Sequence, residues 1–175
     1  MLRPLLLSAA ACLSLAACAT KADMQADAAM AAGNMTPTQR GAYVEMAAAS
    51  DLFEIQTGRM AQERGQSAAV RQFGAMLVEH HQRTTAQLSA AAMASGTMPT
   101  PDLMPMQVQM MAELRAASGS GFDQVFIRQQ IQAHEMALAL HSNYAARGDT
   151  PALRTVANAA VPVVRQHLEQ ARTLR

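Results

Sequence analysis

The chain has 175 residues, enough for one domain with a hydrophobic core and too few to make two domains the default expectation. Half of the residues are hydrophobic, the formal net charge is +1 at pH 7, and the aromatic residues are two Tyr, four Phe and no Trp. A nucleic-acid partner would require a basic patch and stacking aromatic rings, so this composition argues against one.

The first 17 residues have the layout of an export signal. Arg3 supplies a positive start, and an apolar stretch from Leu5 to Ala11 follows, too short to span a bilayer as a helix. The next segment, Leu15-Ala16-Ala17-Cys18, resembles the lipobox of bacterial lipoproteins. The resemblance implies that residues 1–17 are a lipoprotein signal peptide and that Cys18 becomes the acylated first residue of the mature chain. An ordinary signal peptide is the alternative.

The residue after the cysteine bears on location. It is Ala19, and the lack of Asp there resembles an outer-membrane sorting signal. We therefore expect a protein anchored through lipid on Cys18, on the periplasmic side of the envelope and in the outer membrane.

Cys12 lies inside the signal, so no disulfide can form within the mature chain. Stability must then come from burial of Ala, Met, Leu and Val, most of which favour helices.

Residues 18–36 lack sustained periodicity and are expected to form a flexible tether to a domain at 37–175. Thr36 and Pro37 predict the start of a first helix that runs to Gly65. Ser67 is a candidate N-cap for a second helix, which ends near Gly96.

The connector at 97–118 contains three prolines and a short helical pattern at 106–117. A third long helix is predicted at 122–147, with Gly148 as its C-cap. The fourth begins at Pro151 and carries Pro162, which predicts a kink. Four long helices, two tight turns and a long connector predict an all-α antiparallel four-helix bundle, with a short extra helix between helices two and three.

Several short stretches carry a family resemblance. They are Phe53-Glu54-Ile55 with Gly58, Phe73-Gly74, Val78-Glu79-His80, Gly121-Phe122-Asp123, His134, and Pro162 with His167-Leu168. From about Gly41 to Leu174 the chain resembles the bacterial envelope proteins called domain of unknown function 4142, which implies a ferritin-like fold. It departs at Ala133, where the family usually has an acidic residue, and at Glu79, where it has Asp. Because the family has no settled activity, the resemblance implies fold rather than function.

Each long helix carries one polar residue on its inward stripe: Glu54, His80, His134 and His167. Measured from the connecting turns at 1.5 Å per residue, their levels differ by roughly 10 Å or less, so all four can meet in mid-bundle. Imidazoles and a carboxylate suit Zn²⁺, Cu²⁺ or iron. The alternative is a buried polar cluster in which Glu54 pairs with histidine. Both interpretations stay open.

Ferroxidase chemistry is disfavoured, because a di-iron site uses Glu-x-x-His pairs. Here Glu79 and Glu135 are direct sequence neighbours of His80 and His134, and they should point away from the interior. His81 lies one step off the inward stripe and is expected at solvent or at an interface. His141 is expected to pack against its neighbours, with a ligand role as the alternative.

Methionines crowd the connector, at Met93, Met98, Met104, Met106, Met110 and Met111. Thioethers bind Cu(I) in oxidising compartments. The alternative is that flexible methionine side chains fill irregular gaps at the end of a bundle.

The sequence contains no nucleophile–base pairing, phosphate-binding glycine loop or Cys-x-x-Cys, so we expect no enzymatic activity. The first hypothesis is a non-catalytic, lipid-anchored binding or envelope-stress module whose partner is an unknown protein or envelope component. The alternative is a metal-binding protein (Zn, Cu or Fe) whose site is formed by Glu54, His80, His134 and His167.

Overall fold

The computed structural model describes residues 36–174, and the regular structure of this range is entirely helical. The expected all-α class is therefore confirmed for these residues. The expected signal peptide, Cys18 and nearly all of the tether lie outside them. The helices are α2 (Arg40–Arg64), α3 (Ala68–Ala94), α4 (Pro105–Ala116), α5 (Ser120–Arg147) and α6 (Pro151–Thr173).

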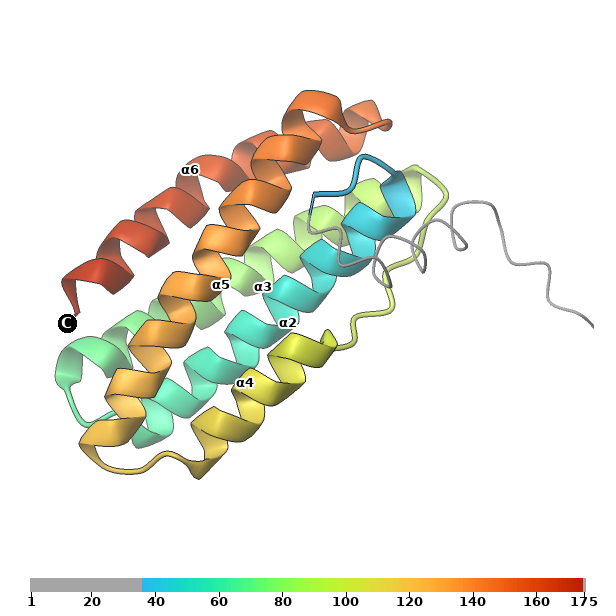
Figure 1. The fold of residues 1–175 in the computed structure, drawn as a ribbon. Coiled ribbons are helices and arrows are strands. Elements are labelled where there is room, and N and C mark those ends of the chain that lie inside the picture. The colour runs from blue at the N-terminus through green and yellow to red at the C-terminus, as the bar shows by residue number, and fades with distance from the viewer. Residues whose placement is uncertain (1–35, 175) are drawn as a thin grey trace, which may run out of the picture.

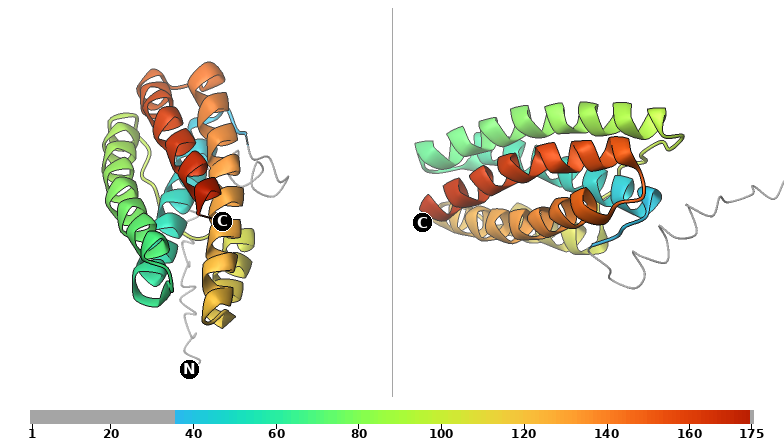
Figure 2. Two further views of the ribbon diagram at one scale, coloured as in Figure 1. Left: turned by 90° about the vertical axis from the view of Figure 1, so that its left-hand side faces the viewer. Right: turned by 90° about the horizontal axis from the view of Figure 1, so that it is seen from above.

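The four long helices form two antiparallel hairpins, α2–α3 and α5–α6, which lie against each other (Figures 1 and 2). Across the two hairpins, α2 contacts α5 and α3 contacts α6. The short helix α4, predicted in the connector, packs outside this group against α5 and α2. The long helices thus share one interior, to which α2, α3, α5 and α6 all contribute.

The first helix starts later than predicted, at Arg40 rather than at Pro37. Asn143 donates hydrogen bonds to the carbonyls of Thr36 and Pro37, at 2.7 and 3.1 Å. The amide of Asp149 donates to the carbonyl of Thr38 at 3.0 Å. These carbonyls accept from α5 and from the α5–α6 turn, so residues 36–38 pack across that turn instead of extending the helix.

The turn between α2 and α3 is held by two side chains. As predicted, Ser67 caps α3, accepting from the amide of Val70 at 3.1 Å. The carboxylate of Asp123, at the start of α5, accepts from the amides of Gln66 and Ser67 at 2.9 Å each. The Gly121-Phe122-Asp123 stretch therefore ties the two hairpins together at one end of the molecule.

The apolar core has two main parts, one toward each end of the long helices, and a smaller cluster packs under α4. One part is built around the stacked rings of Tyr43 and Tyr144 with Leu88 and Leu153. The other contains Phe73, Leu77, Phe122 and Phe126. We call the level between these two parts the polar level, because it holds the buried side chains of Asp51, His81 and His134.

The α2–α3 hairpin is closely spaced where two glycines face each other. A Cβ atom on Gly58 would lie 2.7 Å from the carbonyl oxygen of Gly74, and one on Gly74 would lie 2.6 Å from that of Gly58. Side chains at these positions would force the helices apart. The glycines thus permit the backbone contact that brings the α2 and α3 sides of the polar level together.

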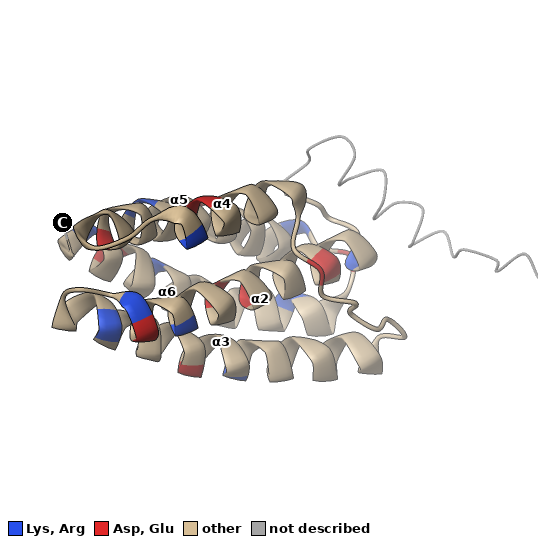
Figure 3. Ribbon diagram, turned by 90° about the horizontal axis from the view of Figure 1, so that it is seen from below, with Lys and Arg blue, Asp and Glu red and all other residues tan. Residues whose placement is uncertain are grey.

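Acidic and basic residues are interspersed over the helices (Figure 3). Exposed ion pairs such as Arg83–Glu79 and Arg172–Glu135 join neighbours of opposite sign. Among the described residues, no helix combines the length and the hydropathy that crossing a membrane requires.

Candidate metal centre

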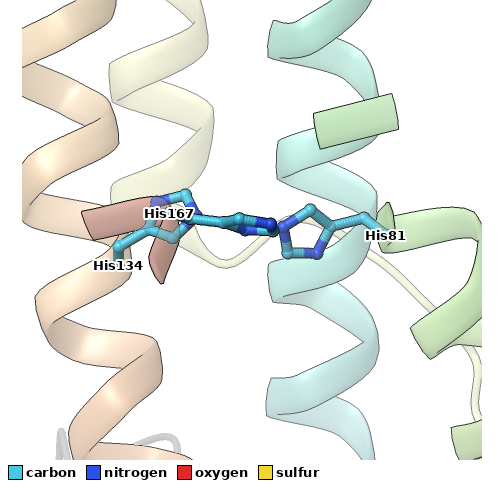
Figure 4. A group of neighbouring side chains, drawn as sticks. All are labelled: His81, His134 and His167. Carbon is cyan, nitrogen blue, oxygen red and sulfur yellow. The ribbon is translucent and has the colours of Figure 1, made fainter. Parts of the chain in front are cut away.

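Three histidines from three different helices meet in the polar level between the two parts of the core. His81 comes from α3, His134 from α5 and His167 from α6, and their rings point toward one another (Figure 4). One ring nitrogen from each lies within 4.8 Å of those of the other two. All three are buried, with exposed fractions of 5, 1 and 0%.

The outer nitrogen of each ring has a hydrogen-bonding partner. The pairs are His81 Nδ1 with Asp51 Oδ1, His134 Nδ1 with the Gln130 carbonyl, and His167 Nε2 with His80 Nδ1, each at 2.8 Å. Such contacts fix the ring orientation and the tautomer of metal-ligating histidines.

The remaining nitrogens face inward. His81 Nε2 is buried and has no hydrogen-bond partner. His134 Nε2 lies 3.3 Å from His167 Nδ1. Because Nδ1 of His134 donates to a carbonyl, its Nε2 carries a lone pair when the ring is neutral. Three nitrogens thus converge, and one of them is a buried polar atom without a partner, which is costly unless something binds there.

Asp51 of α2 is the main anchor for His81. Besides the imidazole, its Oδ1 accepts from the Thr84 hydroxyl at 2.8 Å, and its Oδ2 lies 3.2 Å from the Thr85 hydroxyl, which is closer to the His81 carbonyl at 2.7 Å. Both threonines lie on α3, so the carboxylate faces hydroxyl groups of the helix that carries the histidine. This arrangement positions the ring across the α2–α3 interface.

Burial keeps two of the three rings neutral. It lowers the pKa of His134 to about 3, with a further lowering from the nearby charge of His81. Burial likewise lowers the pKa of His167 to about 2, aided by repulsion from His134 and His81. Both rings are unprotonated at neutral pH, which is the form that binds a metal ion.

The pKa of His81 shifts in the opposite direction. Burial alone would lower its pKa, but the hydrogen bond to Asp51 and the charges of Glu54 and Asp51 outweigh burial and raise it. The charged acceptor therefore increases the basicity of this ring, as a carboxylate does for a metal-bound histidine.

The structure corrects the expectation for His81, which is buried and belongs to the converging group. His80 is only partly buried and contacts the group through His167. The buried stripe of α3 continues from Leu77 by a step of four to His81 and by seven more to Leu88. A step of three from Leu77 reaches His80 equally well, so adjacent histidines could not be separated by periodicity alone.

Asp51 was not singled out from the sequence, although a signal was present. It falls on the same stripe of α2 as Ala47, Glu54 and Gly58, at steps of four, three and four, and it is buried. A buried carboxylate at this position indicates a nearby donor, because an unpaired charge there is costly.

Glu54 lies beside the histidines but behind one of them. Its Oε1 is 3.8 Å from Nδ1 of His134, the nitrogen that faces away from the converging group, and its Oε2 is buried without a partner. Burial raises the pKa of Glu54 to about 7, although the charge of His81 and a hydrogen bond from Gln130 lower it. A carboxyl group that is partly protonated at pH 7 contacts a neutral imidazole here.

His141 belongs to a separate pair, about two turns beyond His134 on α5. Its Nδ1 lies 3.1 Å from the hydroxyl of Tyr43, and burial lowers its pKa to about 4. The expected packing role agrees with this contact. Glu79 and Glu135, expected to point outward, are exposed and pair with arginines.

The connector methionines have different surroundings. Met93 and Met98 are exposed, whereas Met110 and Met111 of α4 pack with Phe53 and Ala133 in a small apolar cluster. The buried pair thus fills the space between α4, α2 and α5, as the packing alternative predicts.

No curated protein matches the sequence of this chain. Among solved structures, CopM in the Cu(I)-bound form has a similar fold, with a TM-score of 0.65 and 18% identity, covering 77% of this chain and 94% of that one. The Cu(II)-bound form gives 0.64 and 18%, with 75% and 91% covered. CopM in the apo form gives 0.63 and 18%, with 75% and 92% covered.

A family model covers most of the sequence, as the motifs in helices one to four implied. The model described as domain of unknown function (DUF4142) matches residues 24–174. The chain therefore belongs to this family.

Proposed function

We propose that this protein binds one transition-metal ion through His81 Nε2, His134 Nε2 and His167 Nδ1. The observation that carries the proposal is the convergence of three ring nitrogens, one from each histidine, within 4.8 Å, together with the hydrogen-bonding partner that holds each ring from outside. A metal ion would replace the weak 3.3 Å contact between His134 and His167 and would supply the partner that His81 Nε2 lacks. The ligands come from three helices, so binding should also stabilise the fold.

Copper is the ion to test first. Imidazole nitrogens suit Cu, Zn and Fe, and among divalent ions a given nitrogen site binds Cu²⁺ most tightly. CopM, which has a similar fold, has been solved in Cu(I)-, Cu(II)- and Ag-bound forms. At 18% identity its ligands do not transfer to this chain, so the argument for copper here rests on the three imidazoles.

The setting of this site is also part of the proposal. We infer a ferritin-like four-helix bundle from the contacts among α2, α3, α5 and α6. We infer a lipid anchor at Cys18 on the periplasmic side of the envelope from the Leu15-Ala16-Ala17-Cys18 segment. The anchor predicts that Cys18→Ser moves the protein out of the membrane fraction. A variant that still sediments with membranes and incorporates labelled palmitate would contradict it.

Metal stoichiometry tests the function directly. The mature chain, made without a His-tag and with Cys18→Ser, is loaded with Cu²⁺ or Zn²⁺, dialysed and analysed for metal. We expect about one ion per chain, as for a site with closely placed imidazole ligands. His134→Ala and His81→Ala should each remove the bound ion.

His141→Ala is the matched control, because it removes a nearby histidine outside the converging group. It should retain the ion. Equal loss in His141→Ala and His134→Ala, or no retained metal in the parent chain, would instead support a buried polar cluster that stabilises the interior without binding metal.

A further inference from the structure

A cavity of about 50 Å³ lies beside the histidine group, lined mainly by α3 and α6 and also by residues of α2 and α5. His81 and His167 line it, whereas His134 does not. On the outer side, the exposed residues Gln87 and Ala159 also border it. The cavity therefore reaches from the surface to two of the three proposed ligands.

The position of the cavity matters for coordination. Three imidazoles leave at least one position of a four-coordinate ion, tetrahedral for Zn²⁺ or square-planar for Cu²⁺, and a further ligand must approach from the open side. The cavity is lined mainly by α3 and α6 and does not include His134, although His141 of α5 borders it. Glu54 is the alternative fourth ligand, but its closest contact to the group is with the outward-facing Nδ1 of His134.

The size and lining of the cavity limit what it can hold. A water molecule needs at least about 10–15 Å³ of such space, so a few atoms fit and a larger ligand does not. Tyr43, Asp51, Thr84 and His141 line it together with Ala160 and Val163 of α6, and most of its lining is apolar. Such a pocket suits a small donor such as water, and an anion would enter it only through its bond to the metal ion, since the Asp51 carboxylate lies in the wall.

We propose that the metal ion keeps an open coordination position facing this cavity, occupied by water and exchangeable for a small monodentate anion that enters between α3 and α6. This inference rests on the proposed function and adds to it a ligand class. It implies a centre accessible to small molecules, in contrast to structural metal sites, in which protein ligands fill every position.

Azide is a suitable probe, because it is a small linear anion whose binding to Cu²⁺ produces a charge-transfer absorption band. The mature chain with Cys18→Ser is loaded with one equivalent of Cu²⁺ and titrated with azide. We expect a saturable band and a matching change in the electron paramagnetic resonance spectrum. Failure to retain Cu²⁺ would defeat the proposed function, whereas retained Cu²⁺ without an azide band would overturn only the open position.

Filling the cavity should block the anion without removing the metal. Ala160→Leu places a larger side chain in the cavity, and Val163→Phe does so near its partly exposed rim. Each should retain about one equivalent of Cu²⁺ and bind azide at least tenfold more weakly. Val163 is only partly buried, so that variant is expected to fold even if Ala160→Leu does not.

Ala137→Leu is the matched control. It makes the same change on α5, in a separate cavity of about 20 Å³ lined by Met46, Met104 and Met136, and should leave azide affinity unchanged. Wild-type azide affinity in both cavity-filling variants would overturn the proposal. So would azide binding that appears only after Glu54→Gln, because Glu54 would then occupy the fourth position.

Discussion

At the residue scale, the centre depends on which nitrogen of each ring is free. A neutral His134 can keep its proton on Nδ1, where it bonds to the Gln130 carbonyl, and expose a lone pair on Nε2. A neutral His167 has one proton and partners on both sides, His80 at 2.8 Å and His134 at 3.3 Å. Metal binding at Nδ1 of His167 requires its proton on Nε2, where Nδ1 of His80 can accept it. His80 is then a positioning residue rather than a ligand.

Asp51→Asn tests whether the carboxylate tunes the metal site. The variant keeps the size of the side chain but removes the charge that increases the basicity of His81. Loss of such a partner typically lowers metal affinity by about 10- to 100-fold, so we expect a decrease of this order in chelator competition. Asp102→Asn, at an exposed position, is the matched control and should bind like the parent. Unchanged affinity in Asp51→Asn would show that His81 needs no charged anchor.

The buried histidines also predict how the metal-free chain responds to acid. His141 has a pKa of about 4 in the folded chain, below the ordinary histidine value, so between these pH values the unfolded chain binds more protons. The free energy of unfolding should therefore fall as the pH falls through this range. His134 and His167, whose pKa values are lowered to about 3 and about 2, act in the same direction. Glu54, whose pKa is raised to about 7, partly opposes them at pH values above its ordinary pKa.

His141→Asn isolates one part of this dependence, because the amide oxygen can still accept from Tyr43 while the titrating ring is removed. Urea unfolding of the metal-free chain at a series of pH values from 7 to 4 measures it. The slope of the unfolding free energy against pH should become shallower by an amount that corresponds to at most one proton taken up on unfolding. Parallel curves for the variant and the parent would mean that His141 is protonated alike in the folded and unfolded states.

Much of the site could be predicted from residue types, but not its details. Two of the predicted residues, His134 and His167, lie in the converging group. His80 and His81 are successive residues of α3, so their side chains point about 100° apart around the helix axis. Which of the two faces the interior depends on how the whole helix is rotated about that axis. That rotation is set by the packing of α3 on α2 and α6, which sequence spacing does not specify.

At the scale of the elements, the helices were easier to predict than the site because each is bounded by residues with a strong local preference. Ser67 caps α3, and Gly148 follows the last residue of α5. The start of α2 was misplaced, since Pro37 suits the first turn of a helix, yet the carbonyls of residues 36–38 bond to side-chain and backbone donors elsewhere. Tertiary hydrogen bonds of this kind leave no local signal.

Gly74→Ala tests the close approach of α2 and α3. The added Cβ would lie 2.6 Å from the Gly58 carbonyl oxygen and 2.7 Å from the Cβ of Ala61. Overpacking of this kind costs roughly 1–3 kcal/mol, so we expect a loss of that size in urea unfolding. Gly121→Ala is the control, since a Cβ there meets nothing within 4 Å and alanine favours the helix. Equal stability of the two variants would mean that the hairpin has room at Gly58 and Gly74.

At the scale of the whole molecule, the polar centre lies between two apolar parts of one core. The metal-free fold thus buries three imidazoles and keeps His81 Nε2 without a partner. A bound ion would offset this cost, because a ligand that binds only the folded chain stabilises it, by about 2.7 kcal/mol at a hundred times its dissociation constant. If an ion binds as proposed, the metal-bound chain should therefore be more stable than the metal-free one.

The first hypothesis from the sequence, a module that binds a protein or an envelope component, concerns the surface rather than the interior. A metal centre does not exclude such a partner. The two hypotheses differ in which substitutions should impair function. Changes to His81, His134 or His167 should affect metal binding, whereas changes to exposed residues should affect a partner site.

X-ray absorption spectroscopy of the copper-loaded mature chain tests the central claim most directly, because it identifies the atoms bound to the ion. We expect a first shell of nitrogen with the multiple-scattering pattern of about three imidazoles, together with one light exchangeable donor. His134→Ala should reduce the imidazole contribution. A first shell dominated by sulfur would place the ion at methionines such as Met104 and Met106, and a shell without imidazole would contradict the histidine centre altogether.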